Sequence, residues 1–376
     1  MSKRKKIPDH IMLKLWVKSG GRCEFPGCNE MVWCDKLTLK EDNFAHMAHI
    51  IAASSNGPRG DAVLSAALQT DYDNLLLLCL IHSKLADGKN KSDYSVEDLI
   101  KYKTLHEDRI RIQTELAPEH KTTVVIFQSP IRDRQVIISK PQALAALYPR
   151  YPADEKGLQF DFSSKSGSGD ENFWNEYSRE ISEQVKHSLR KGNNEQRYEH
   201  LSIFGLAPIP ALMCFGNQVG NIIASDLFQK HRDTDDWKWK QEPSADAFEY
   251  QYSFNDGSDK SKVVLVLSLS GKIASIEYKR ILGNEVPVYE IEVENASPEF
   301  LSYKSRLEKF RGLYRQTISD LRAKYGGDCV IHLFPAIPSP IAILCGKELL
   351  PKADPPVLVY DYDKAQGGFL PTLTIK

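Results

Sequence analysis

An internal repeat constrains the fold of this 376-residue chain more than any other feature of its sequence. Segments 201–216 and 331–346 align at an offset of 130 residues. Four residue pairs match across the two segments: Phe204 with Phe334, Pro208 with Pro338, Pro210 with Pro340, and Gly216 with Gly346. Each copy accompanies a buried-strand pattern, at 135–140 and 262–268, and a long helical pattern, at 171–191 and 298–325. Alternating strands and helices favour a mostly parallel sheet with right-handed crossovers, so we expect two Rossmann-like halves, about 121–255 and 256–376.

A ligand pocket is expected where the strands of these halves end, because open parallel sheets bind ligands beyond their carboxyl ends. A pocket shared by two like halves suits a ligand with pseudo-two-fold symmetry. The chain has no Gly-x-Gly-x-x-Gly fingerprint, which argues against a dinucleotide cofactor such as NAD. Turns, aromatic rings and cations near the predicted strand ends supply the candidate ligand-binding residues: Lys140, Pro208, Trp237, Trp239, Ser270, Lys272, Arg280, Pro338 and Tyr360. An equal alternative is that Trp237 and Trp239 anchor the core or an interface.

Two short cysteine patterns near the N-terminus indicate a metal site. Cys23 and Cys28 are separated by four residues that include a Pro-Gly turn, and Cys79 is followed at the ligand spacing by His82. Seven cysteines, an odd and unevenly spread number, argue against a disulfide framework. The pattern therefore predicts a Cys3His structural zinc site, with Cys34 as a weaker ligand that more simply packs. The alternative is four unrelated residues, two of them buried hydrophobes.

A histidine and an asparagine lie between these cysteine patterns. The order Cys pair, His49, Asn74, Cys-x-x-His resembles the HNH nuclease motif, the ββα-metal fold. The resemblance implies that His49 is the general base that deprotonates water for attack on a phosphodiester, which a neutral imidazole can do near pH 7. It implies that Asn74 orients the loop or helps to hold the metal, and that a divalent cation, Mg²⁺, stabilises the charge on the phosphate.

The match to the HNH motif is incomplete at the magnesium site. Many relatives carry an acidic residue or a histidine directly before the base, where this chain has Ala48, and a second histidine where it has Ser83. The candidate magnesium ligands are therefore His46, Asp73 and Ser83, with Asp71 and Asp87 as further substitutes. Arg59 and Lys84 are either phosphate contacts or solvated surface charges. An inactive, DNA-binding remnant of an HNH domain remains an alternative.

The second copy of the repeat carries a further resemblance. The run Phe-Pro-Ala-Ile-Pro-x-Pro-Ile-Ala, ending at Gly346 and followed by the apolar segment 357–361, resembles the SAVED domain. That family fuses two CARF-like halves that sense cyclic oligonucleotides. The HNH–SAVED order resembles effector nucleases of CBASS, a bacterial anti-phage system in which a cyclase makes a cyclic di- or trinucleotide. The resemblance implies that the ligand drives homo-oligomerisation, which activates degradation of double-stranded DNA and aborts the infection.

Composition and net charge limit where the protein can act and how it can bind nucleic acid. No apolar run approaches the roughly 20 residues of a membrane span, and no secretory signal is recognisable, so we expect a cytoplasmic protein without membrane contact. The net charge is −1, and residues 1–120 carry 17 basic and 17 acidic side chains. Nucleic-acid binding must then come from local patches or from the assembly of several chains.

We therefore expect an α/β chain with an N-terminal zinc-stabilised ββα-metal (HNH) domain at 1–118 and a duplicated Rossmann-like SAVED domain at 119–376. The leading hypothesis is a cyclic-nucleotide-activated DNA endonuclease. One alternative is an ungated HNH restriction endonuclease, although a DNA reader should carry a basic face. The other is a non-catalytic nucleotide sensor with a degenerate HNH module.

Overall fold

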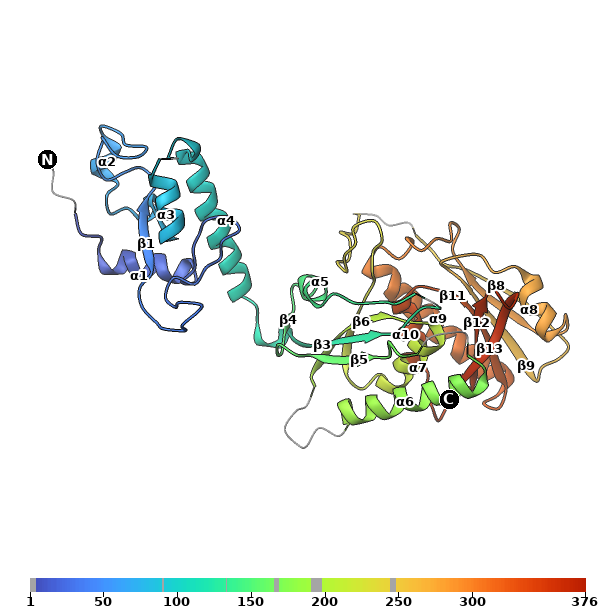
Figure 1. Cartoon of the computed structure of the whole chain (residues 1–376). Coiled ribbons are helices and arrows are strands. Elements are labelled where there is room, and N and C mark those ends of the chain that lie inside the picture. The colour runs from blue at the N-terminus through green and yellow to red at the C-terminus, as the bar shows by residue number, and fades with distance from the viewer. Residues whose placement is uncertain (1–4, 90, 133, 166–168, 191–197, 244–247) are drawn as a thin grey trace. The chain divides into compact units, whose positions relative to one another are not determined.

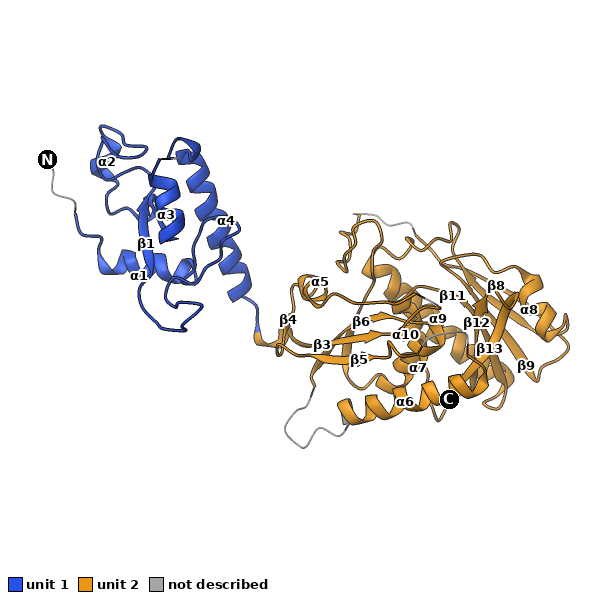
Figure 2. Cartoon of the chain, in the orientation of Figure 1, with its two compact units in different colours: residues 1–117 blue, residues 118–376 orange. Residues whose placement is uncertain are grey.

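The computed structural model describes residues 5–89, 91–132, 134–165, 169–190, 198–243 and 248–376 (Figure 1). The chain divides into two compact units, residues 1–117 and 118–376, so the division lies one residue before the predicted boundary (Figure 2). No helix in the described ranges is long and apolar enough to span a membrane.

The first unit contains a two-stranded hairpin followed directly by a helix. Its elements are α1 (Asp9–Lys18), β1 (Ala45–His49), α2 (Leu64–Ala67), η1 (Tyr72–Asn74), β2 (Leu75–Cys79), α3 (Leu80–Asp87), η2 (Lys91–Asp93) and α4 (Val96–Thr114). β1 and β2 are antiparallel, with His49 opposite Leu75. Residues 75–78 of β2 are buried, and they pack with α1 and α4 in the core of this unit. Ser95 and Asp98 form a capping box at the start of α4, since each side chain bonds the backbone of the other residue.

The second unit begins with a parallel sheet. Its first elements are η3 (Pro118–His120), β3 (Lys121–Gln128), α5 (Lys140–Ala145), β4 (Tyr151–Pro152), β5 (Leu158–Asp161), α6 (Glu171–Val185), the π-helical turn η4 (Lys186–Arg190), β6 (His200–Leu206), α7 (Ile209–Val219) and β7 (Ala224–Phe228). The strand order is β4-β3-β6-β7, with β5 also paired to β3, and every pairing is parallel. This half has the alternating strand–helix order that the sequence predicts.

A second sheet with the same central order follows. Its elements are β8 (Gln251–Asn255), β9 (Lys262–Ser268), α8 (Ser275–Leu282), β10 (Val288–Glu292), α9 (Lys304–Tyr325), β11 (Val330–Ala336), α10 (Ser339–Glu348), β12 (Val357–Asp363) and β13 (Gly368–Ile375). The order is β13-β12-β11-β9-β10-β8, with antiparallel strands β8 and β13 at the two edges. Because β8 pairs with β10, residues 251–255 belong to the second half, so the halves meet before β8 and not at about 255/256 as predicted.

The strand predicted at 135–140 is also wrong. β3 is the partner of β6, and its inner residues are buried on both faces, as a central parallel strand requires. By contrast, Ile137 is 84% exposed, and the segment leads into α5 instead of a ladder. The backbone N–H of Ile138 donates a hydrogen bond to the side chain of Gln128. Residues 135–138 therefore do not form a strand, and Ile138 is apolar because it is buried under α5.

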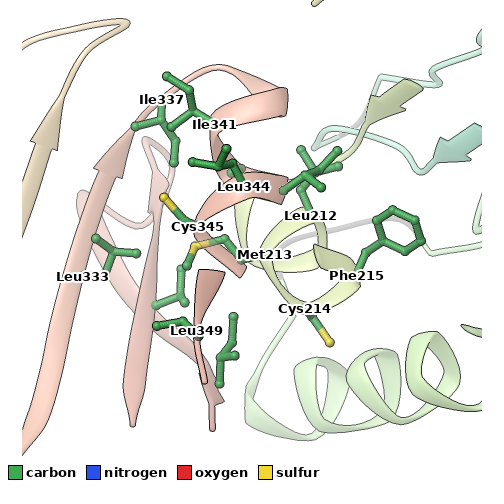
Figure 3. Close-up of a cluster of buried hydrophobic side chains, with 14 of the residues drawn as sticks. Leu212, Met213, Cys214, Phe215, Leu333, Ile337, Ile341, Leu344, Cys345 and Leu349 are labelled. Atoms are coloured by element: carbon green, nitrogen blue, oxygen red, sulfur yellow. The ribbon is translucent and has the colours of Figure 1, made fainter. Parts of the chain in front are cut away.

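The two halves join through the equivalent helices α7 and α10 (Figure 3). Both helices are apolar nearly all round, as helices enclosed by a core must be. The contact is reciprocal: Gly216 of α7 lies against the backbone of Ile343, and Gly346 of α10 lies against the backbone of Met213. Positions 213 and 343, like 216 and 346, differ by 130 residues, so the repeat offset is also the symmetry of the contact.

Candidate functional sites

His49 ends β1 in the first unit and is 7% exposed. Its Nε2 lies 2.9 Å from the backbone carbonyl oxygen of Gln69. A carbonyl oxygen only accepts hydrogen bonds, so Nε2 carries the proton in this pair. In the neutral imidazole Nδ1 is then the nitrogen whose lone pair can take up a proton. This arrangement gives His49 the tautomer that a general base needs.

Asn74 holds the other end of the loop that begins after His49. Its Oδ1 accepts a hydrogen bond from the N–H of Ile51 at 2.8 Å. Its Nδ2 donates to the carbonyl oxygens of Ile51, at 2.9 Å, and Leu68, at 3.1 Å. Of the two roles that the resemblance leaves open, these bonds match the orientation of the loop.

Replacing Asn74 by alanine is expected to destabilise the first unit by about 2–4 kcal/mol, because three hydrogen bonds are lost and buried backbone groups stay unpaired. Urea denaturation of the full chain measures the change. Asn56→Ala is the matched control, since this asparagine is exposed in the same loop and its replacement should stay within about 0.5 kcal/mol of the parent. Equal losses in both variants would contradict the loop-holding role.

Of the three candidate magnesium ligands, the structure separates His46 from His49. His46 is exposed and lies on the opposite face of β1, because side chains three residues apart in a strand point to opposite sides. Asp73 belongs to η1 and lines a cavity with residues of α1 and α4, and Ser83 lies on α3. His46 therefore does not fit an ion beside His49, whereas the roles of Asp73 and Ser83 stay predictions.

Arg59 binds backbone groups within the first unit and is not exposed for contact with phosphate. Its guanidinium donates hydrogen bonds to the carbonyl oxygens of Ile50, at 2.7 Å, and Ala86, at 2.8 Å. It also forms an ion pair with Asp87 at 2.5 Å, and its side chain is 8% exposed. These bonds tie the loop after β1 to the end of α3, and they commit Asp87, a further magnesium candidate, to the ion pair with Arg59.

The predicted zinc ligands come together at the start of α3. The ligand atoms of Cys23, Cys28, Cys79 and His82 all lie within 4.8 Å of one another. In the described parts of the chain this is the only group of three or more His, Cys, Asp or Glu side chains close enough to share an ion. The ring of Phe25 stacks on His82 with 4.2 Å between centroids, which fixes the imidazole plane. The donor set and its closeness fit a tetrahedral Cys3His ion of the zinc type.

In the second unit, two cavities lie at the carboxyl ends of the central strands. The Pro208 pocket, of about 270 Å³, is lined by Pro208 of the first half and by Asp361 near the carboxyl end of β12 in the second. The Pro338 pocket, of about 210 Å³, is lined by Pro338 of the second half and by His231 after β7 of the first. Pro208 and Pro338 differ by 130 residues. The strand-end residues that complete the pockets follow Phe228 and Tyr360, which stack on the matched Phe204 and Phe334, so the two pockets are equivalent under the repeat. Each pocket combines the Pro-x-Pro loop of one half with the strand end of the other.

Three of the nine predicted ligand-binding residues line these pockets: Pro208, Ser270 and Pro338. Trp237 and Tyr360 are 1% and 3% exposed and are core residues, stacked or packed against Phe204 and Phe334 respectively. Their prediction as ligand contacts is wrong, because strand-end aromatics here fill the outer faces of the sheets.

The four remaining candidates lie outside both pockets. Lys140 is bound to the backbone carbonyl oxygens of Glu155 and Lys156. Arg280 donates to the carbonyl oxygen of Gly367, and Lys272 is exposed beside Glu292. Trp239 lines a different cavity, described below. The prediction of one pocket, formed by the Lys140 and Ser270–Lys272 turns and the two Pro-x-Pro loops, is therefore corrected to two smaller pockets.

The sequence analysis missed the charged residues after β7 and at the carboxyl end of β12. Lys230, His231 and Arg232 line the Pro338 pocket, whereas Asp361 lines the Pro208 pocket. Burial raises the pKa of Asp361 to about 6 and lowers the pKa of His231. The signal was available, because these residues directly follow apolar runs in the sequence.

Comparisons with known proteins support the reading of the second unit. A family model, SAVED ("SMODS-associated and fused to various effectors sensor domain"), matches residues 180–375. A search of curated proteins found no match.

Solved structures of SAVED/CARF-domain receptors are similar to the chain. The Acinetobacter baumannii Cap4 receptor with the cyclic trinucleotide 2′3′3′-cAAA is 15% identical, with a TM-score of 0.46 over 84% of this chain and 67% of that one. The same receptor with 3′3′3′-cAAA is 13% identical, with a TM-score of 0.46 over 85% and 72%. The Moraxella osloensis Cap4 receptor is 13% identical, with a TM-score of 0.40 over 84% and 70%. Since the family model covers more than half of the residues, the chain belongs to the SAVED family of sensor domains.

Proposed function

We propose that the chain is a DNA endonuclease gated by a cyclic di- or trinucleotide, with the SAVED domain as sensor and the first unit as nuclease. The observation that carries the proposal is the combination, in one chain, of a sensor domain and a ββα unit whose histidine has the tautomer of a general base. The order Cys pair, His, Asn, Cys-x-x-His supports the HNH assignment of the first unit.

In the proposed reaction, Nδ1 of His49 takes a proton from water. The water oxygen then forms a bond to the phosphorus of a DNA phosphodiester, and the bond from phosphorus to one sugar oxygen breaks. The magnesium ion implied by the HNH resemblance stays a prediction, and no residue is assigned to it.

We assign the Cys3His cluster to structural zinc. Zinc would cross-link the loop that holds Cys23 and Cys28 to the start of α3, which carries His82. A closed ligand set of this kind leaves no position for substrate, so its contribution is to hold the ββα unit together.

The ligand is proposed to span the Pro208 and Pro338 pockets, with one nucleotide in each. Aromatic and cationic side chains suited to bases and phosphates line them, including Phe173 and Arg132 in the first and Lys230 in the second. Ligand binding would drive homo-oligomerisation. Several charge-balanced nuclease units would then bind double-stranded DNA together through avidity, which gives the expected abortive anti-phage response.

Plasmid cleavage by the full chain, with Mg²⁺ and a panel of cyclic di- and trinucleotides, tests the proposal. We expect cleavage only with one or a few nucleotides, together with a ligand-dependent rise in mass by light scattering. His49→Ala should lower the cleavage rate about 100- to 10,000-fold without weakening nucleotide binding, because only proton transfer is removed.

His46→Ala is the matched control on the same strand and should cleave like the parent, because this side chain faces away from His49. Cleavage without any nucleotide would favour an ungated restriction endonuclease. Nucleotide binding without cleavage would favour a sensor with a degenerate HNH module. Full cleavage by His49→Ala would reject this histidine as the base.

A further inference from the structure

A third cavity of about 690 Å³ lies beside the edge strand β7 in the second unit. It is lined by His120, which precedes β3, whereas the Pro208 and Pro338 pockets are lined by Pro130 and Ile131, which follow β3. The eight residues of β3 separate the two ends by roughly 26 Å, so this is a separate site. We call it the Asp226 pocket.

The charges that line the Asp226 pocket are unequal. Arg150, Lys238 and Lys304 are its cations, and Asp226 is its single carboxylate. Asp226 accepts hydrogen bonds from Arg150 Nε at 2.9 Å and from Lys304 Nζ at 2.6 Å. Burial alone would raise the pKa of Asp226, but these bonds outweigh it and hold the pKa below its usual value. One carboxylate thus fixes two cations in place, and the lining keeps an excess of two positive charges.

Two aromatic side chains of the Asp226 pocket have buried ring nitrogens without hydrogen-bond partners in the described residues. They are Trp239, through its indole Nε1, and His120, through its imidazole Nδ1. Buried polar atoms of this kind cost about 1–3 kcal/mol each unless a partner is supplied. Tyr148 lines the same pocket and is 67% exposed, so its ring is available for stacking.

We propose that the Asp226 pocket binds a phosphate group carried beside an aromatic base, as in a nucleotide or a nucleic-acid strand. The planar guanidinium of Arg150, already oriented by Asp226, offers its remaining N–H groups to phosphate oxygens, and Lys238 and Lys304 add compact positive charges. Tyr148 and Trp239 provide surfaces for a base. The proposal also assigns a role to two residues that the sequence analysis singled out or placed beside one: Lys238 and Trp239 line this pocket, while Trp237 packs in the core.

Fluorescence titration of the full chain at low salt tests this site with three probes: inorganic phosphate, AMP and a 20-nucleotide DNA strand. We expect saturable quenching with AMP that is lost in Trp239→Phe. We expect Kd to rise at least tenfold in Arg150→Gln and about three- to tenfold in Lys238→Gln. Lys352→Gln removes an exposed charge of the same unit outside the pocket and should leave Kd unchanged.

Arg150→Gln breaks an ion pair with Asp226 and could therefore disturb the fold. Lys238 is exposed, so Lys238→Gln should leave the fold intact and tests the same pocket independently. Weakened binding of both AMP and DNA would support a nucleotide site. Weakened DNA binding alone, with a smaller salt dependence in Lys238→Gln, would assign the phosphate to a strand. Binding of all three probes that is unaffected by both variants, or no binding at all, would overturn the proposal. The titration uses neither cleavage nor cyclic nucleotides, so its result is independent of the proposed function.

Discussion

Gly346→Ala is expected to destabilise the second unit by about 3 kcal/mol or more. A Cβ on Gly346 would overlap the carbonyl oxygen of Met213 and lie 2.8 Å from its carbonyl carbon and 2.9 Å from the backbone nitrogen of Asn217. All three atoms belong to the backbone of α7, so no side-chain rotation relieves the overlap. The helices α7 and α10 must separate, and the cost falls at the upper end of that for overpacked cores.

The same argument applies to the equivalent position in the repeat. A Cβ on Gly216 would overlap the carbonyl oxygen of Ile343 and lie 2.9 Å from its carbonyl carbon, so Gly216→Ala should have a similar effect. The helices carry the shared core of both halves, including Leu212, Phe215 and Leu344 (Figure 3). Separation at either glycine would therefore loosen both sheets together.

Gly312→Ala is the matched control. Gly312 is exposed within α9, and no atom lies within 4 Å of the position of its Cβ. Alanine there should stabilise the chain by about 0.5–1 kcal/mol, because glycine is the poorer helix former. Calorimetric unfolding of the full chain measures all three variants. A change of less than about 1 kcal/mol in Gly346→Ala would show that the helices are not this close.

Cys79→Ser is expected to abolish the fold of the first unit while leaving the second unit intact. Structural zinc contributes about 10–16 kcal/mol of apparent binding free energy in zinc-finger peptides, so the loss of one thiolate should cost several kcal/mol. The first unit has little else to replace it, since its two strands have only five residues each. We expect about one zinc per chain in the parent by elemental analysis, and the calorimetric transition of the first unit to disappear in the variant.

Cys34→Ser is the matched control for the zinc prediction. Cys34 is also buried, at 7% exposure, but its thiol bonds the backbone of Asp35 and lies outside the four-residue cluster. This variant should keep the zinc and both transitions. Zinc retention and an unchanged transition in Cys79→Ser would reject the cluster as a structural metal site, and a chelator that removes zinc without unfolding the first unit would do the same.

The arrangement of the duplicated unit followed largely from the sequence. The 130-residue offset predicted two like halves, and the glycine pair found in it became the reciprocal contact of α7 and α10. The closeness of Cys23, Cys28, Cys79 and His82 was also predicted, because metal-ligand pairs depend on short spacings along the chain. The errors came from apolar runs such as 135–140, whose pattern does not say whether a β-partner is present.

The ligand candidates show where sequence reasoning ends. Trp237 and Trp239 are two residues apart, and the sequence left open whether they bind a ligand or pack. The tertiary structure decided differently for each: Trp237 is enclosed under α5, while Trp239 lines the Asp226 pocket with Arg150 and Lys304, far away in the sequence.

The sequence by itself determined the duplication and the closeness of Cys23, Cys28, Cys79 and His82, because each depends on residues at fixed spacing. Only the tertiary structure decided that His46 faces away from His49 and that the Asn74 side chain bonds backbone groups of the loop after β1. It also decided that two equivalent pockets lie at the carboxyl ends of the central strands. A pocket or a free side chain depends on which distant segments pack around it. Those contacts are set by the burial of the whole core and leave no local pattern in the chain.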